Sequence, residues 1–315
     1  MRRKHSFFVA LAAVAIIGIG YYHANGSNSK FSAPAISHIL KHQANKGLSK
    51  AQEKARQHKA YIGRNTLGNH STNHSTNHST NDQTNVASIN FALSERTNVQ
   101  VPNSFAYMHG KRKFVMRPLD NLGRAQGSHI QVSAKTLPKG TRPQRITVNP
   151  AGWHNYKFTV KGIKPVKYNW LYNRGHLVGY QFCGINSDKR NLITQTTYVN
   201  QGSLNGMNDS NPKGQLYYEN KLRNWINTHP SDSLDYSVVP GYHGNELVPR
   251  YVILTFVGYN KNGKEISVDL HSKHTGKSGK YHYVMLMNTS PQAHINYATG
   301  RAKVWNANGS LASRG

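Results

Sequence analysis

The chain has 315 residues, which is long enough for a sizeable core and one or two domains. Lys and Arg number 40 against 12 Asp and Glu, and the resulting formal charge of +28 indicates a polyanionic partner: nucleic acid, an anionic membrane or an acidic wall polymer. The shortage of carboxylates argues against a calcium site built from many of them. The single cysteine, Cys183, excludes an internal disulfide and a zinc site of several thiolates, and it is predicted to be inert.

Residues 1–24 have the pattern of a signal peptide or signal anchor. Arg2, Arg3 and Lys4 precede a nearly uncharged run over residues 6–22. This run is slightly shorter than the roughly 20 residues of a full membrane span, and no clear cleavage site follows it. A cleaved signal and an uncleaved membrane anchor therefore both stay open. Either one predicts an extracellular or cell-surface protein, secreted or membrane-anchored.

Residues 25–97 are predicted to be a disordered polar linker. The tetrapeptide Asn-His-Ser-Thr occurs three times in succession over residues 69–80. Such a tract cannot bury enough apolar surface to offset the entropy cost of ordering it. Its histidines could hold a metal weakly, but a spacer that keeps a folded domain away from the membrane or wall is the favoured interpretation.

Residues 98–315 carry the pattern of a folded α+β domain with a substantial antiparallel sheet. The formal charge of residues 101–315 is +19, so much of the positive excess belongs to this domain. A helix is predicted from Asn211, as N-cap, and Pro212, in the first turn, to His229-Pro230. Asn262-Gly263 is a hairpin signal. Apolar runs predict strands at residues 128–132, 156–160, 176–182, 192–196, 234–239, 251–259, 265–270 and 281–287.

One segment holds residue types that suit phosphodiester hydrolysis, which requires an activated water, a cation and help for the leaving oxygen. His176 is a candidate general base, since its ordinary pKa lies near working pH. Asn200 offers the hard carbonyl oxygen that Mg²⁺ accepts, and Arg174 can bind a phosphate oxygen. Glu219 could accept hydrogen bonds from metal-bound water or complete the metal shell.

Each of these residues also has an ordinary structural interpretation. A histidine in a strand is usually just hydrogen-bonded, Asn191 suits a turn, and Asn200 suits a helix cap. Glu219 could pair with Arg223 four positions along a helix. Taken singly, these interpretations are favoured. The occurrence of all the residues in order, within one segment of a basic chain, favours the catalytic set.

The motifs in this segment resemble a known family. Arg174-Gly175-His176-Leu177, followed by Asn191-Leu192 and Asn200-Gln201, resembles the ββα-metal signature of the DNA/RNA non-specific endonucleases. Residues 119–124, 152–154, 177–180, 195–196 and 217–219 are similar to its membrane-anchored DNA-entry subgroup in Gram-positive bacteria. The resemblance covers roughly residues 98–301 and the N-terminal anchor.

The resemblance implies a central antiparallel sheet that carries a ββα finger, and an endonuclease that uses one Mg²⁺ ion, with Mn²⁺ as a substitute. It implies that His176 is the general base, that Asn200 binds the metal directly and that Glu219 acts at the metal or its waters. Asn191 would support the hydrogen bonding of the site, and Arg174 would bind the phosphate or stabilise the transition state. The products would be 5′-phosphate and 3′-hydroxyl ends of DNA, with RNA left open as a second substrate.

One residue departs from the family pattern, because Asn173 stands where the family usually has Asp. Asn keeps an acceptor oxygen and loses the charge. If the Asp polarises a neighbour, activity would be lower in this chain. If it only caps a backbone turn, Asn serves equally well. The second interpretation is favoured, because the other site residues are present.

The densest basic groups are predicted to follow the phosphate backbone, with little sequence specificity and a strong dependence on salt. They comprise Lys111, Arg112, Lys113, Arg124, Lys189 and Arg190, together with Lys161, Lys164 and Lys167. Two other functions stay open: a non-catalytic surface receptor for DNA on the same fold, which Asn173 supports, and a cationic adhesin or wall-binding protein. The sequence does not indicate an oligomeric state.

Overall fold

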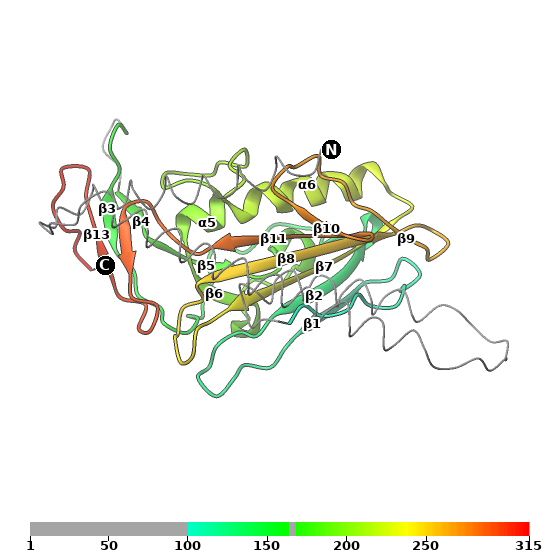
Figure 1. Ribbon diagram of the computed structural model, residues 1–315, viewed down its shortest axis with the longest axis horizontal. Helices are drawn as coiled ribbons and strands as arrows, with labels where there is room; N and C mark the ends of the chain where they lie inside the picture. The colour runs from blue at the N-terminus through cyan, green and yellow to red at the C-terminus, as the bar shows by residue number, and fades with distance from the viewer. Residues whose placement is uncertain (1–99, 164–167, 315) are drawn as a thin grey trace, which may run out of the picture. The chain divides into compact units, whose positions relative to one another are not determined.

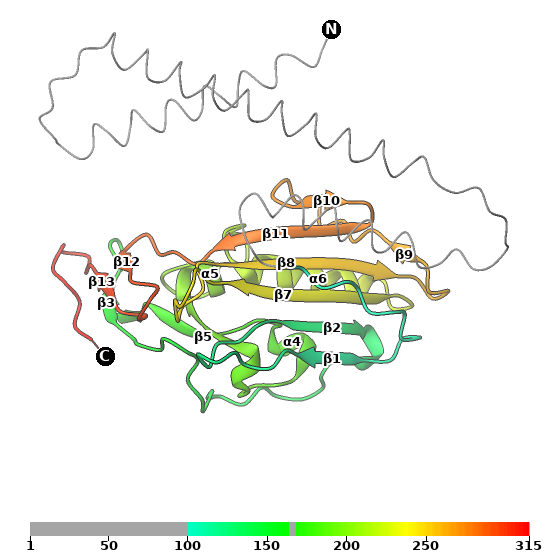
Figure 2. The ribbon, with the colours of Figure 1, turned by 60° about the horizontal axis from the view of Figure 1, so that its bottom comes forward.

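The computed structural model describes residues 100–163 and 168–314. The predicted signal segment, the linker, Lys164 and Lys167 lie outside the described residues. The main element is a seven-stranded antiparallel sheet with the order β1-β2-β7-β8-β11-β10, in which β9 pairs with β8 (Figures 1 and 2). Its strands are β1 (Lys113–Met116), β2 (Ser128–Ser133), β7 (Ser233–Gly241), β8 (Tyr251–Tyr259), β9 (Glu265–Ile266), β10 (Gly276–Ser278) and β11 (Tyr281–Met287).

Three small two-stranded sheets accompany the large one within the described residues. They pair β3 (Lys157–Thr159) with β4 (Tyr168–Trp170), β5 (Tyr172–His176) with β6 (Leu192–Thr196), and β12 (Ala293–Ile295) with β13 (Ala302–Val304). The α-helices of the described part of the chain are α4 (Tyr180–Cys183), α5 (Thr197–Gln201) and α6 (Gln215–Thr228), with short 3-10 turns η1 (Ala134–Thr136) and η2 (Lys189–Asn191). The predicted α+β class with a central antiparallel sheet is confirmed.

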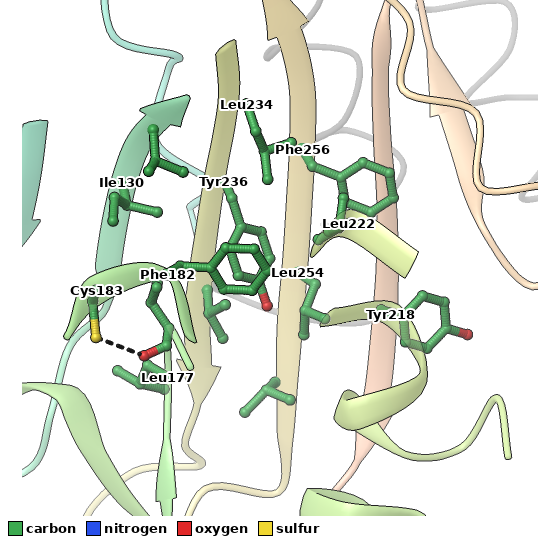
Figure 3. Close-up of a cluster of buried hydrophobic side chains, with 14 of the residues drawn as sticks. Ile130, Leu177, Phe182, Cys183, Tyr218, Leu222, Leu234, Tyr236, Leu254 and Phe256 are labelled. Carbon is green, nitrogen blue, oxygen red and sulfur yellow. Dashed lines mark hydrogen bonds between the residues drawn. The ribbon is translucent and has the colours of Figure 1, made fainter. Parts of the chain in front are cut away.

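The main core lies between one face of the large sheet and the helices α4 and α6. Figure 3 shows Phe182 of α4 and Leu222 of α6 against Tyr236, Leu254 and Phe256 of the sheet. The rings of Phe182 and Tyr236 are 5.6 Å apart between centroids. Burial of these apolar side chains supplies the main drive that holds the helices on the sheet. None of the helices among the described residues is long and apolar enough to cross a bilayer.

Apolar runs predicted the well-packed strands accurately. The strands at 192–196, 251–259 and 281–287 are confirmed to the residue, and β2, β3 and β7 match within two positions. The hairpin signal is also confirmed, since the Gly263 amide donates to the Asn260 carbonyl at 2.9 Å and Gly263 has φ +79°. That left-handed conformation favours glycine.

The predicted strand at 176–182 is wrong, because β5 ends at His176 and the chain turns into α4 at Tyr180. Cys183 therefore lies in a helix and does not follow a strand alternation. Gly184, with φ +67°, ends α4 as its C-cap. A short apolar run fits a buried strand and a buried helix equally well, so its period cannot separate the two. The predicted strand at 265–270 is shorter, since only Glu265–Ile266 pairs with β8.

The predicted start of the long helix is also wrong, because α6 begins at Gln215 with Gly214 as its N-cap. Asn211 instead closes a turn before the helix. Its Oδ1 accepts from the Lys213 amide at 3.0 Å, and its carbonyl accepts from the Gly214 amide at 2.9 Å. Asn and Pro favour such a turn as strongly as a helix start, which explains the error.

Candidate functional site

A strand–strand–helix unit of 30 residues places the predicted site residues. β5 and β6 pair in antiparallel register with His176 opposite Leu192. α5 follows β6 directly, and the Thr196 hydroxyl caps it by accepting from the Val199 amide at 3.2 Å. The structure therefore contains a ββα unit at the place where the motif resemblance predicted one.

The unit opens on a cleft of about 990 Å³. Residues from β5, α5, α6 and the loop around residue 144 line this cleft, among them Arg142, Arg145, Trp153, Trp170, Asn173, Arg174, His176, Asn200, Gln215 and Glu219. Among the described residues that line it, Glu219 is the one carboxylate, against three arginines. The cleft is therefore strongly basic and suited to a polyanion.

His176 lies at the cleft as a neutral imidazole. Its side chain is buried, and Nε2 lies 3.1 Å from the Asn186 carbonyl oxygen. Because a carbonyl only accepts, Nε2 carries the hydrogen and Nδ1 keeps its lone pair. Burial, together with the nearby Arg142 guanidinium, lowers the pKa of His176 to about 4. Hydrogen bonds to the backbone carbonyls of Asn186 and Ile185 oppose this change, because they raise the pKa. The ring is therefore uncharged at neutral pH and can accept a proton, and the lowered pKa makes it a weaker base than a free imidazole.

Asn200, on α5, lines the same cleft, and its carboxamide makes no hydrogen bond to any described residue. Asn173 fixes the helix that carries Asn200. Its Oδ1 accepts from the Thr197 hydroxyl at 3.2 Å, and its Nδ2 donates to Gln201 Oε1 at 3.2 Å. Both ends of the Asn173 amide are used inside the chain, which suits a residue that holds β5 to α5.

Glu219 is a buried carboxylate at the floor of the site. Its Oε1 accepts from the Gly179 amide at 3.0 Å, from Gln215 Nε2 at 3.0 Å and from the Tyr236 hydroxyl at 3.1 Å. Burial raises the pKa of Glu219 to about 7, and these hydrogen bonds oppose the rise. The alternative pairing with Arg223 is not formed in the described part, where Arg223 donates to the Gln181 carbonyl at 2.7 Å.

Asn191 is fully buried and lies outside the cleft lining. Its Oδ1 accepts from the Val178 amide at 3.0 Å, and its Nδ2 donates to the Val178 carbonyl at 2.9 Å. The Leu177 amide donates to the Asn191 carbonyl at 2.9 Å. Asn191 therefore fixes the backbone that follows His176, and it is a positioning residue for the site, with no contact to the cleft.

Nine basic residues are predicted to bind nucleic acid, and the seven of them that the structure describes, Lys161 included, lie outside the cleft lining. The guanidinium of Arg124 is engaged by the chain itself: it donates to Asp120 at 2.7 Å and to the carbonyls of Gly244 and Glu246 at 2.8 Å. Lys113 begins β1, and Lys111 lies two residues before it. Arg112 donates to the Cys183 carbonyl. Lys189 lies in η2, and Arg190 forms an ion pair with Asp188 at 2.6 Å.

The arginines that do reach the cleft include two that the sequence analysis missed, Arg142 and Arg145. Arg142 donates to Asn186 Oδ1 at 3.1 Å, next to the carbonyl that holds His176. Residues 138–150 contain prolines, two arginines and no acidic residue, and this composition could have indicated a basic loop. The predicted Arg174 is also there, with its guanidinium carbon 4.4 Å from the centroid of the Trp153 ring.

Known proteins match this fold and this site region. The model of the DNA/RNA non-specific endonuclease family matches residues 102–262, which is about half of the chain. The chain belongs to this family. A solved structure named extracellular endonuclease is 35% identical, with a TM-score of 0.54 over 66% of this chain and 94% of that one. A second, named extracellular nuclease, is 34% identical with a TM-score of 0.51 over 63% and 96%.

A curated relative, a deoxyribonuclease of Streptococcus dysgalactiae subsp. equisimilis, is 28% identical over 173 residues. The match covers 45% of this chain and 50% of that protein, so the chain spans about half the length of this relative. The family predicted from the motifs is confirmed.

A close approach of β5 and β6 explains the glycine in the family motif. A Cβ at Gly175 would lie 2.2 Å from Gln195 Oε1 and 2.6 Å from Gln195 Cβ. Gly175→Ala should therefore force the strands apart, destabilise the domain by about 1–3 kcal/mol and displace His176. Denaturant unfolding measures the loss. Gly309→Ala is the comparison, because a Cβ there meets nothing within 4 Å: its loss, also about 1–3 kcal/mol, comes from positive-φ strain alone and should leave His176 and cleavage unchanged. Equal stability of Gly175→Ala and the wild type would contradict this packing.

The two buried titratable groups of the site should change stability with pH in opposite directions. The folded-state pKa of His176, about 4, lies below the ordinary value of 6.5, so the folded state binds fewer protons than the unfolded chain between these pH values. His176 therefore destabilises the domain as the pH falls from about 6.5 to 4. Glu219, with its pKa raised to about 7, instead destabilises it as the pH rises from 4.5 to 7.

The variants His176→Gln and Glu219→Gln separate these effects in denaturant unfolding at pH 4.5 and 7.5. Relative to wild type, His176→Gln should gain stability at pH 4.5, by on the order of 2–3 kcal/mol. Glu219→Gln should gain stability relative to the wild type at pH 7.5. Differences that stay constant across the two pH values would contradict the pKa shifts.

Proposed function

We propose that the chain is an extracellular or surface-attached endonuclease that hydrolyses phosphodiester bonds of DNA with a divalent metal ion. One observation carries this proposal: His176, with an available Nδ1, and Asn200, with an unengaged carboxamide, line the same arginine-rich cleft. Membership of the family and the names of the relatives, extracellular endonuclease and deoxyribonuclease, support it.

The residues of the cleft fit Mg²⁺, or Mn²⁺ in its place. Within the described residues there is no group of three or more His, Cys, Asp or Glu that could hold a metal, so an ion with a full set of protein ligands is not expected. Mg²⁺ commonly keeps several waters and takes few protein oxygens. The Asn200 carbonyl oxygen would hold the ion, and Glu219 would bind its waters. When bound, the ion would neutralise charge that develops on the phosphate.

The chain's own residues supply the remaining steps. His176 Nδ1 takes a proton from the water that attacks phosphorus. Arg174 and Arg142 hold the phosphate oxygens by charge-assisted hydrogen bonds. The bond from phosphorus to the 3′ oxygen breaks as the water oxygen bonds to phosphorus, and the departing 3′ oxygen takes a proton from solvent water, which leaves 5′-phosphate and 3′-hydroxyl ends. Asn173 and Asn191 keep α5 and the segment after His176 in place.

A plasmid assay with the full-length chain tests the proposal. Supercoiled plasmid should convert to nicked, linear and then short products with Mg²⁺, and chelator should stop the conversion. End-labelling should detect 5′-phosphates. Added salt should slow the reaction, because phosphate contacts release counterions. Intact plasmid with Mg²⁺ and with Mn²⁺, together with salt-dependent binding, would overturn the enzyme and favour a surface receptor for DNA.

A further inference from the structure

Two aromatic side chains are exposed on β4, the strand next to the cleft. Tyr168 is 61% and Trp170 is 43% exposed. They are two positions apart in a strand, so both project from the same face of the β3–β4 hairpin. Trp170 also lines the cleft that holds His176. The exposed face therefore runs from the reaction site outward along β4.

This aromatic face carries positive charge. Lys157 pairs with Trp170 in the register of the hairpin, and its Nζ lies 4.7 Å from the centroid of the Tyr168 ring. On the cleft side, the guanidinium of Arg174 lies over the ring of Trp153. Aromatic rings with interleaved cations are the combination that binds nucleic-acid bases together with their phosphates.

The spacing of these two positions along the strand indicates the form of the ligand. Residues two apart in a strand are separated by about 6.6 Å. Successive bases in one strand of duplex DNA are separated by only about 3.4 Å. Neighbouring bases that stack on Tyr168 and Trp170 must therefore be separated from each other, which a paired and stacked duplex does not permit. An unpaired, extended strand meets this requirement.

The hairpin is held firmly, so the two rings are positioned before any ligand arrives. The buried side of the hairpin, with Phe158, packs in a cluster that includes Val304 of β13. The Thr159 amide donates to Asn306 Oδ1 at 3.0 Å, and the Thr159 hydroxyl accepts from the Ala307 amide at 3.0 Å. Figures 1 and 2 show β3 and β13 together at one end of the large sheet. A preorganised surface costs little entropy on binding.

We propose that Tyr168 and Trp170 form a subsite that binds an unpaired DNA strand by stacking and extends the cleft along β4. This inference rests on the proposed function, because the strand it holds is the substrate of the neighbouring site. Lys157 neutralises a phosphate of the same strand. A duplex binds to the arginines of the cleft and does not contact this subsite.

Fluorescence anisotropy with the full-length chain in chelator, where no cleavage occurs, tests the subsite. The probes are a 20-nucleotide oligo(dT) and a 20-base-pair duplex at equal salt. Tyr168→Ala, which lies outside the cleft lining, should weaken oligo(dT) binding roughly 5- to 150-fold and change duplex binding less than about twofold. Trp170→Ala should weaken oligo(dT) binding by a similar factor, and because Trp170 also lines the cleft, its effect on the duplex does not test the subsite. Trp170→Phe should keep most of the affinity. Met287→Ala, which removes an exposed apolar side chain of β11, is the control and should change neither.

The outcomes separate the subsite from the proposed function. Equal losses for oligo(dT) and duplex in Tyr168→Ala, or no loss of oligo(dT) binding in either variant, would overturn the subsite even if the wild type cuts plasmid. Selective loss of oligo(dT) binding supports the subsite even if the plasmid stays intact, in which case the nuclease proposal alone fails. Thermal melting of each variant shows whether it is folded, and both exposed side chains can be removed without opening the core.

Discussion

His176→Ala should lower the rate of plasmid cleavage by roughly 10²–10⁴-fold, the usual contribution of a positioned general base. The variant loses the group that takes the proton from water and keeps the arginines that hold the phosphates. DNA binding in chelator should therefore stay close to that of the wild type. The measurement is the initial rate of loss of supercoiled plasmid at saturating Mg²⁺.

A second histidine provides the matched control. His274 is exposed and lies outside the cleft lining, and its main-chain amide, not its side chain, donates to the Ser272 hydroxyl at 3.3 Å, so His274→Ala should cut at the wild-type rate. Cleavage by His176→Ala within a few-fold of wild type would remove His176 from the mechanism. A parallel loss of DNA binding would instead indicate that the change had disturbed the cleft.

Asn200→Ala should raise the Mg²⁺ concentration that gives half-maximal cleavage by at least roughly 10- to 100-fold, the cost of losing even an outer-shell partner of a metal. The carboxamide of Asn200 makes no hydrogen bond to a described residue, so its removal should cost little stability. Titration of Mg²⁺ in the plasmid assay measures the shift, and thermal melting checks the fold.

Asn224→Ala is the control for this change, because Asn224 is an exposed asparagine on α6 outside the cleft lining. Asn200→Asp keeps a hard oxygen at the same position and should retain metal-dependent cleavage. A wild-type Mg²⁺ dependence in Asn200→Ala would rule out Asn200 as the metal ligand and leave Glu219 as the remaining candidate.

The sequence predicted those parts of the fold that depend on a repeated local pattern. Strands β8 and β11 lie in the large sheet with long apolar runs, and their bounds were predicted to the residue. The segment after His176 was not, because a run such as 177–183 is apolar in either conformation. The helix forms because Phe182 is buried against the sheet, where its ring contacts Tyr236. These two residues are far apart in the sequence, so a short stretch of sequence around Phe182 cannot predict the contact.

The site residues also differ in how well the sequence predicted them. The positions of His176 and Asn200 followed from a motif, and the structure brings both to one cleft. The basic residues could not be ranked in this way, since charge density along a chain says nothing of where a side chain points. Arg124 belongs to a local ring of hydrogen bonds with Asp120, whereas Arg142 reaches the cleft from a loop.

The position of Cys183 has a practical consequence. Its thiol is buried and donates to the Val178 carbonyl at 3.3 Å, and burial raises its pKa to about 11, so almost no reactive thiolate exists at neutral pH. Because the chain has no other cysteine, it can meet oxidants without cross-linking to a second molecule. A new cysteine introduced on the surface would be the sole point of attachment for a maleimide dye, which gives a direct route to following the movement of DNA on this protein.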